Sequence, residues 1–296
     1  MKETIVCTGE VGSRPYTFPE TGISVFSYEE LCYYLSGHML CYLYTLPEES
    51  LLEYIRDELK LNKLYRQLVK MRDPNRDQMK FFAALFREGN YFSEEDIRNI
   101  LDRYRELKQT PYPMQCKLIG DMYLEAGRSS MAVFYYKEAL KFETLDAANQ
   151  GKVYHNMAAA KIRLFRFEDA KVDFLKAYQY GGSEDSLFYY FCVIAITEDI
   201  QHAREEIEGF HVSDVVTESF ESRFAGISDS FRYTGAAAAG KRIRYLMDHE
   251  RQEEARRLLE QFIAGLRQEF RKELYMDENL LVTNLPISYT IENRPN

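Results

Sequence analysis

The segment Gly235–Lys241 has the residue spacing of a phosphate-binding loop. In such a loop, backbone N–H groups cradle the phosphates and the lysine neutralises their charge. Arg242 occupies the next position, where a Ser or Thr hydroxyl would bind Mg²⁺. The loop also requires a buried β-strand before it, whereas four consecutive alanines favour a helix. We therefore interpret the segment as a helix contact made by small residues, and we keep a nucleotide-binding hydrolase as an alternative function.

Cysteine and histidine show no spacing typical of redox or metal chemistry. The chain contains neither CxxC nor HExxH, and an odd number of cysteines is unlike a secreted disulfide framework. We expect buried thiols and structural or solvated imidazoles, with no metal and no cofactor. No Ser/His/Asp set stands out either, so we predict that the chain is not an enzyme. The residues concerned are Cys7, Cys32, Cys41, Cys116, Cys192, His38, His155, His202, His211 and His249.

Overall charge argues against binding to nucleic acid or to an anionic membrane. The chain has 296 residues, of which 46% are apolar, and its net charge is −9. That charge repels phosphate-rich partners, and we identify no local basic patch. The first residues lack an apolar run of signal-peptide length, and no window approaches the length of a membrane span. We therefore expect a soluble, cytoplasmic protein.

The first 26 residues are predicted to form an N-terminal arm, a small β-hairpin made by the β-prone runs Thr4–Cys7 and Ile23–Phe26. Helical spacing then dominates residues 27–108, where we expect four or five helices. Ser27 and Glu30 have the spacing of a capping box, and Ser93 begins another helix. Two prolines in residues 109–113 end this region and indicate a domain boundary.

Residues 114–180 contain a repeated pattern of small and aromatic residues. The first unit has Ile119, Gly120 and Tyr123 in one helix and the second has Lys161 where that tyrosine is expected. The other pattern positions are Ala132, Tyr136, Ala139, Tyr154, Ala158, Ala170, Phe174 and Ala177. This pattern resembles the tetratricopeptide repeat (TPR) family, whose unit of about 34 residues is a pair of antiparallel helices. We assign residues 112–210 to TPR-like repeats, two good and one degenerate, the last of these containing Ala203.

The resemblance implies a scaffold that binds a peptide or partner helix in a concave groove. The groove candidates are Lys117, Asp121, Tyr154 and Asn156. Lys117 and Asn156 match two positions of the clamp with which co-chaperone TPR domains hold a peptide carboxylate. Asp121 replaces an asparagine of that clamp, and the third unit offers Asp185 and Tyr189 where cations are expected. A chaperone-associated role is therefore a hypothesis.

The C-terminal part is predicted to close the solenoid. Residues 211–275 form a helical cap, which ends in an amphipathic helix from about residue 252. Residues 276–296 read as an extended apolar tail, which either docks on this chain or holds a structural oligomer together.

Together these patterns predict an all-α protein, a TPR-like helical-hairpin solenoid with a helical N-terminal region and a β-prone arm. Its start and its repeats also resemble uncharacterised TPR-containing proteins of Gram-positive anaerobic bacteria. We expect an adaptor with a protein or peptide partner, and neither nucleic acid nor membrane.

Overall fold

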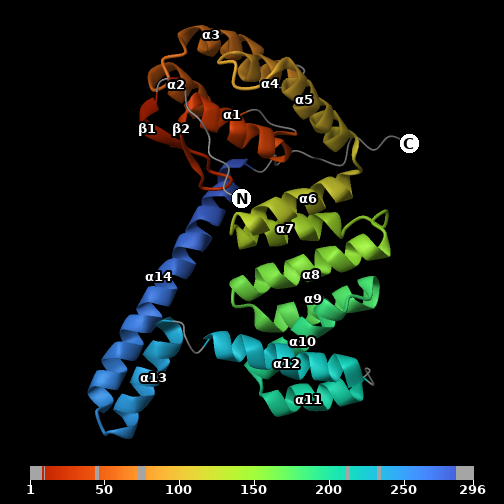
Figure 1. Cartoon of the computed structure of the whole chain (residues 1–296), viewed down its shortest axis with the longest axis vertical. Helices are drawn as coiled ribbons and strands as arrows, with labels where there is room; N and C mark the ends of the chain where they lie inside the picture. The colour runs from red at the N-terminus through yellow and green to blue at the C-terminus, as the bar shows by residue number, and fades with distance from the viewer. Residues whose placement is uncertain are drawn as a thin grey trace. The chain divides into compact units, whose positions relative to one another are not determined.

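The computed structural model describes residues 9, 11–43, 47–72, 78–210, 214–231 and 235–284 (Figure 1). It is mostly helical, as the sequence predicts, with one small two-stranded sheet. The chain divides into two compact units, residues 1–126 and residues 127–296. Each unit is described by itself.

The first unit opens with an antiparallel hairpin of β1 (Val11–Thr17) and β2 (Ser24–Ser27). The predicted second strand is thus confirmed to within one residue. The predicted first strand at residues 4–7 lies outside the described residues, and the segment that pairs with β2 is β1. Gly22 has a φ of 72° at the turn, a conformation that suits glycine because it has no Cβ.

Among the described residues of the first unit, six α-helices and one short 3-10 helix follow the hairpin. They are α1 (Tyr28–Gly37), η1 (Met39–Tyr42), α2 (Glu49–Asp57), α3 (Asn62–Met71), α4 (Gln78–Arg87), α5 (Glu94–Gln109) and α6 (Tyr112–Glu125). The predicted helix starts are confirmed at Ser27, whose hydroxyl accepts the N–H of Glu30, and at Ser93, which forms a full capping box with Asp96. The Glu30 carboxylate accepts the N–H of Phe26 at 2.6 Å, which ties the end of β2 to the start of α1.

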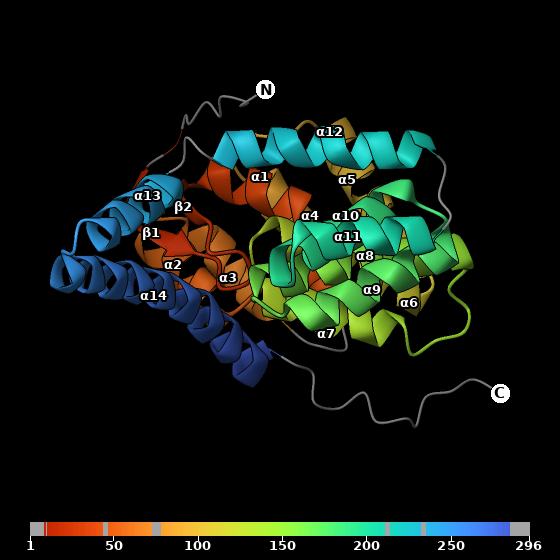
Figure 2. The same cartoon turned by 90° about the horizontal axis from the view of Figure 1, so that it is seen from below.

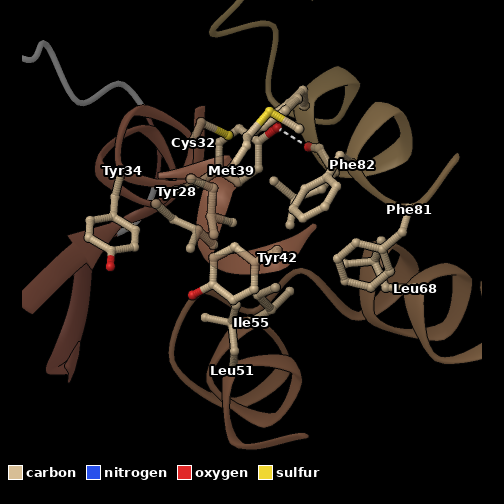
Figure 3. Packing of buried hydrophobic residues seen from close by; sticks show 14 of the residues in the cluster. Tyr28, Cys32, Tyr34, Met39, Tyr42, Leu51, Ile55, Leu68, Phe81 and Phe82 are labelled. Carbon is tan, nitrogen blue, oxygen red and sulfur yellow. Dashed lines mark hydrogen bonds between the residues drawn. The ribbon is translucent and has the colours of Figure 1, made fainter. Parts of the chain in front are cut away.

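Side chains from α1, η1, α2, α3 and α4 meet in one apolar core (Figure 3). Tyrosine hydroxyls inside it donate to polar groups of distant segments, as buried hydroxyls must. Tyr28 donates to the carbonyl oxygen of Leu85 at 2.5 Å, and Tyr54 donates to that of Val25 at 3.0 Å. The abundant tyrosines therefore supply apolar area and also connect elements that are far apart in the sequence.

Helix α6 is fastened to the end of α5 across the two prolines. The side-chain amide of Gln115 donates to the carbonyl oxygens of Leu107, Lys108 and Thr110 at 3.0, 3.2 and 2.8 Å. These carbonyls lie at the end of α5, where a helix leaves its last acceptors without intrahelical partners. Gln115 therefore caps the end of α5 at the proline-containing break. Helix α6 belongs to the first unit, whereas the sequence analysis groups it with the repeats.

Helices α7 to α11 of the second unit pack in chain order, each against the next (Figure 1). They are α7 (Ser129–Ala139), α8 (Ala147–Arg163), α9 (Phe167–Gly181), α10 (Glu184–Thr197) and α11 (Ile200–Gly209). Helix α12 (Asp214–Phe231) packs against α10, and α13 (Gly235–Asp248) lies alongside α14 (Gln252–Asn284) (Figure 2).

The structure bears on two predictions about the C-terminal part. Residues 235–241 form the first turns of α13, which confirms the interpretation of this segment as a helix, and the element before them is helix α12 rather than the strand that a phosphate-binding loop requires. The second prediction was wrong. Residues 276–284, predicted to be extended, belong to α14. The rest of the predicted apolar tail lies outside the described residues.

Glycine and alanine allow α8 and α9 to pack backbone to backbone. A Cβ atom built on Gly151 would lie 2.6 Å from the Cα of Gly181 and 3.1 Å from the carbonyl oxygen of Ala177. The pattern alanines of the two helices, Ala158, Ala170 and Ala177, are fully buried. Only residues with little or no side chain fit at such a distance.

This contact generates a stability prediction. Gly151→Ala should lower the free energy of unfolding by about 1–3 kcal/mol, because the new methyl group meets backbone atoms that cannot move aside. Gly226→Ala is the control, since a Cβ atom there meets nothing within 4 Å and alanine favours a helix by up to about 1 kcal/mol. Urea denaturation followed by circular dichroism measures both variants. A Gly151→Ala protein as stable as Gly226→Ala would contradict the proposed contact.

Candidate partner-binding surface

The first two groove candidates neutralise each other on α6. The ammonium group of Lys117 donates to the Asp121 carboxylate at 2.6 Å, one helical turn along the same helix. The Lys117 side chain is 12% exposed and that of Asp121 is 26% exposed, so the pair is partly withdrawn from water. A peptide carboxylate would therefore meet a cation whose charge is already balanced.

The other two candidates, Tyr154 and Asn156, both lie half-buried on α8. Two residues along an α-helix correspond to a rotation of about 200°, so their side chains leave opposite sides of α8. Tyr154 stacks on Tyr180 of α9 with ring centroids 5.5 Å apart, and the ammonium nitrogen of Lys176 lies 5.4 Å from its ring centroid. Burial raises the pKa of the Tyr154 hydroxyl. The structure thus assigns Tyr154 to the α8–α9 edge.

His155 links α8 to α10. Its Nδ1 atom shares a hydrogen bond of 2.8 Å with the hydroxyl of Ser186, which is buried near the start of α10. Its ring forms T-shaped contacts with the rings of Phe174 and Tyr189, with centroids 5.4 and 5.7 Å apart. Burial lowers the pKa of this imidazole, and the nearby Asp185 carboxylate opposes that shift. Neutral His155 therefore orders the contact between the two helices.

Tyr189 is the exposed member of this cluster. Its ring stacks on Phe174 at 5.5 Å with an interplanar angle of 24°, yet 40% of the residue faces solvent. The sequence analysis noted Tyr189 as a mismatch to the carboxylate clamp. The signal for its exposure is the aromatic run at residues 188–191, because consecutive helical residues point in different directions and cannot all face the core. In the structure Tyr189 is exposed and its neighbours at 188 and 190 are buried.

Helix α12 adds a charged partner to the surface. The guanidinium carbon of Arg223 lies 3.8 Å from the Phe188 ring centroid, and Nη1 is 3.0 Å from the Asp185 carboxylate. Phe220 of α12, fully buried, packs edge to face on Phe188 and holds the helix in place. We define the α8–α10–α12 surface as His155, Asp185, Tyr189 and Arg223.

The two hydroxyl and thiol groups near this surface are poorly suited to act as nucleophiles. Ser186 is 1% exposed, so its hydroxyl cannot reach a substrate. Burial raises the pKa of the Cys192 thiol to about 12, which keeps it in the weakly nucleophilic protonated form at neutral pH. Aromatic and guanidinium groups on a rigid support are instead the residue types that dominate binding energy at protein interfaces.

Within the described ranges, no group of three or more His, Cys, Asp or Glu side chains is placed to hold a metal ion. No helix in the same ranges is both long and apolar enough to cross a membrane.

A buried ion pair supports α8 from the other side. Lys161, which stands where the repeat pattern has tyrosine, contacts the Asp173 carboxylate of α9, and their side chains are 8% and 6% exposed. The contacting oxygen, Oδ2, makes no hydrogen bond of good geometry. Burial raises the pKa of Asp173, and Lys161 offsets this only in part. The charged carboxylate therefore depends on its lysine.

Removal of that lysine should be costly. Lys161→Met leaves a buried, unpaired carboxylate and should lower the free energy of unfolding at pH 7 by about 3 kcal/mol. Because the raised pKa means that the folded state favours protonated Asp173, the loss should shrink as pH falls toward the carboxyl range. Lys171→Met is the matched control, since its pairs with Glu168 and Glu198 lie at the surface and are worth at most about 1 kcal/mol. The free energy of unfolding of both variants would be measured by denaturant titration at several pH values. Equal losses in Lys161→Met and Lys171→Met would contradict the dependence of Asp173 on Lys161.

His155 should make stability depend on pH. Its pKa is lowered in the folded state, so its contribution is complete above the ordinary value of 6.5 and decreases as pH falls below it. His155→Gln should flatten this part of the curve of unfolding free energy against pH. His202→Gln, at a side chain that is 58% exposed, serves as the control. Equal slopes in the wild type and in His155→Gln would be the contrary result.

Comparison with protein-family models, with curated proteins and with solved structures found no match for this chain.

Proposed function

We propose that the chain is a non-catalytic scaffold that binds a protein segment on the α8–α10–α12 surface. The observation that carries this proposal is Tyr189, a large aromatic side chain that is 40% exposed although Phe174 and His155 hold its ring. A fixed aromatic group loses little conformational entropy on binding, and Tyr and Arg are enriched where single residues dominate affinity.

Local packing supports a TPR-like arrangement of the second unit. The alanines at the helix B positions of the pattern, Ala132, Ala170 and Ala203, are fully buried. Each lies near the start of its helix, in α7, α9 and α11. Helices α7 to α11 contact each other in chain order, and α9 and α11 are the second helices of the pairs α8–α9 and α10–α11. A solenoid of this kind displays its first helices, here α8 and α10, to a partner.

We expect the partner to be recognised through aromatic and polar contacts rather than through its terminal carboxylate. The Lys117–Asp121 pair weakens the carboxylate clamp, because a second carboxylate would have to compete with Asp121. A chaperone-associated role thus has little support from these residues. A cytoplasmic location remains part of the proposal and is favoured by the wide spacing of the five cysteines.

The alternatives receive no specific support. A nucleotide site at residues 235–241 would need a strand and a loop where α12 and α13 are helical. Self-association through the apolar tail involves residues that lie largely outside the described part of the chain.

A peptide selection tests the proposal. Random peptides displayed on phage would be selected against the immobilised full chain, and the affinity of a selected peptide measured by calorimetry. Tyr189→Ala and Arg223→Ala should each weaken binding at least about tenfold, as expected for residues that dominate an interface. Tyr245→Ala is the matched control, because Tyr245 on α13 is also exposed, at 47%, and also stacks on a histidine, His249.

Peptides that bind equally well to the wild type and to Tyr189→Ala would place the binding site elsewhere. Failure to select any peptide that binds above background would count against a peptide-binding scaffold.

A further inference from the structure

Positive charge is concentrated in one short part of the first unit. Residues 60–87 contain eight Lys or Arg and two Asp, a net charge of +6 in a chain of net charge −9. Averaging over the whole sequence hides this segment, so the sequence analysis did not identify it. Helices α3 and α4 pack together, and neither helix contains an Asp or a Glu.

The cations of α3 share one face. Leu64 and Leu68 are fully buried and fix the orientation of the helix, whereas Lys63, Arg66 and Lys70 are exposed on the opposite side at a spacing of three and four residues. This face borders a surface hollow of ≈ 560 Å³. The hollow is lined by Asn62, Lys63, Arg66, Gln67, Lys70 and Met71. We name these six residues the α3 basic face.

Two acids neutralise cations that lie outside α3. Arg72 pairs with Glu49 of α2 at 3.2 Å, and Arg87 of α4 pairs with Glu94 of α5 at 3.0 Å. Lys63 and Arg66 form no ion pair with any residue in the described part of the chain. The centre of the basic face therefore retains its charge.

We propose that the α3 basic face binds an acidic protein helix. The matching partner carries Asp or Glu at positions i, i+3 and i+7 and lies along the ten residues of α3, a length of about 15 Å. Val69, 45% exposed, and Met71 add apolar area beside the cations. Charge complementarity of this kind sets orientation and accelerates association.

The small extent of the α3 basic face favours a short acidic helix over larger anionic partners. Helix α2, which packs against α3, carries Glu49, Glu53 and Asp57, of which Glu49 pairs with Arg72 and Asp57 pairs with Arg56. A nucleic acid or a bilayer surface extends beyond one helix and would meet these carboxylates as well as the cations. A short acidic helix meets the cations alone.

Fluorescence anisotropy with the full chain tests this inference. The probe is a labelled helical peptide with Glu at positions i, i+3 and i+7 of each repeat, and its Gln analogue is the uncharged control. The Glu peptide should bind, the Gln peptide should not, and affinity should fall as salt is added. Lys63→Glu, Arg66→Glu and Lys70→Glu combined should weaken binding at least about tenfold.

Two further variants control for charge and folding. Arg256→Glu, Arg257→Glu and Arg267→Glu combined make the same charge change at exposed positions of α14 and should retain binding. The three α3 residues changed to Gln should also weaken binding, without introducing repulsion between acids on α3. Circular dichroism would verify that all variants fold.

Equal affinity for the wild type and the α3 Gln variant would overturn the inference. It would also be overturned if an oligonucleotide of the same charge as the peptide, or vesicles with phosphatidylserine, bound more tightly than the Glu peptide. Because Tyr189→Ala leaves α3 unchanged, failure here is distinguishable from failure of the proposed function.

Discussion

The close approach of α8 and α9 is the constraint on which the candidate surface depends. Because Gly151 and Gly181 bring the backbones into contact, no side chain separates the helices there, and longer residues are confined to the flanks of the contact. Tyr154 and Tyr180 stack at one flank and Lys161 meets Asp173 at another. His155, on the same helix, packs against Phe174 of α9 and hydrogen-bonds to Ser186 of α10, so it joins the α8–α9 contact to α10.

Features that depend on a few neighbouring residues, such as helix starts, were easier to predict from the sequence than the side of a helix on which a residue lies. Helix starts at Ser27 and Ser93 were identifiable because a capping hydroxyl acts on an N–H three residues away. The strand β1 was missed because Gly12 and Pro15 lower its strand propensity, and its pairing with β2 compensates for that. Residues 276–284 were read as extended from their apolar character, but length and propensity allow α14 to continue through them.

The candidate site residues were also predictable only where their contacts lie within one helix. The ion pair of Lys117 with Asp121 follows from a spacing of four on one helix, so it could have been predicted. Tyr154 and Asn156 were grouped by their place in a repeat, although two residues of separation turn them to opposite sides of α8. Arg223 could not be assigned to the surface, since its contacts with Asp185 and Phe188 depend on how α12 packs on α10.

The two surfaces would respond to different physical variables. Lys63 and Arg66 of the α3 basic face form no ion pair within the described part of the chain, so attraction there acts over a Debye length and weakens with salt. At the α8–α10–α12 surface, Arg223 is already paired with Asp185, and the exposed ring of Tyr189 gains free energy chiefly by leaving water. Salt should therefore change the rate at which an acidic helix associates with α3, while contacts at Tyr189 govern how long a partner stays bound.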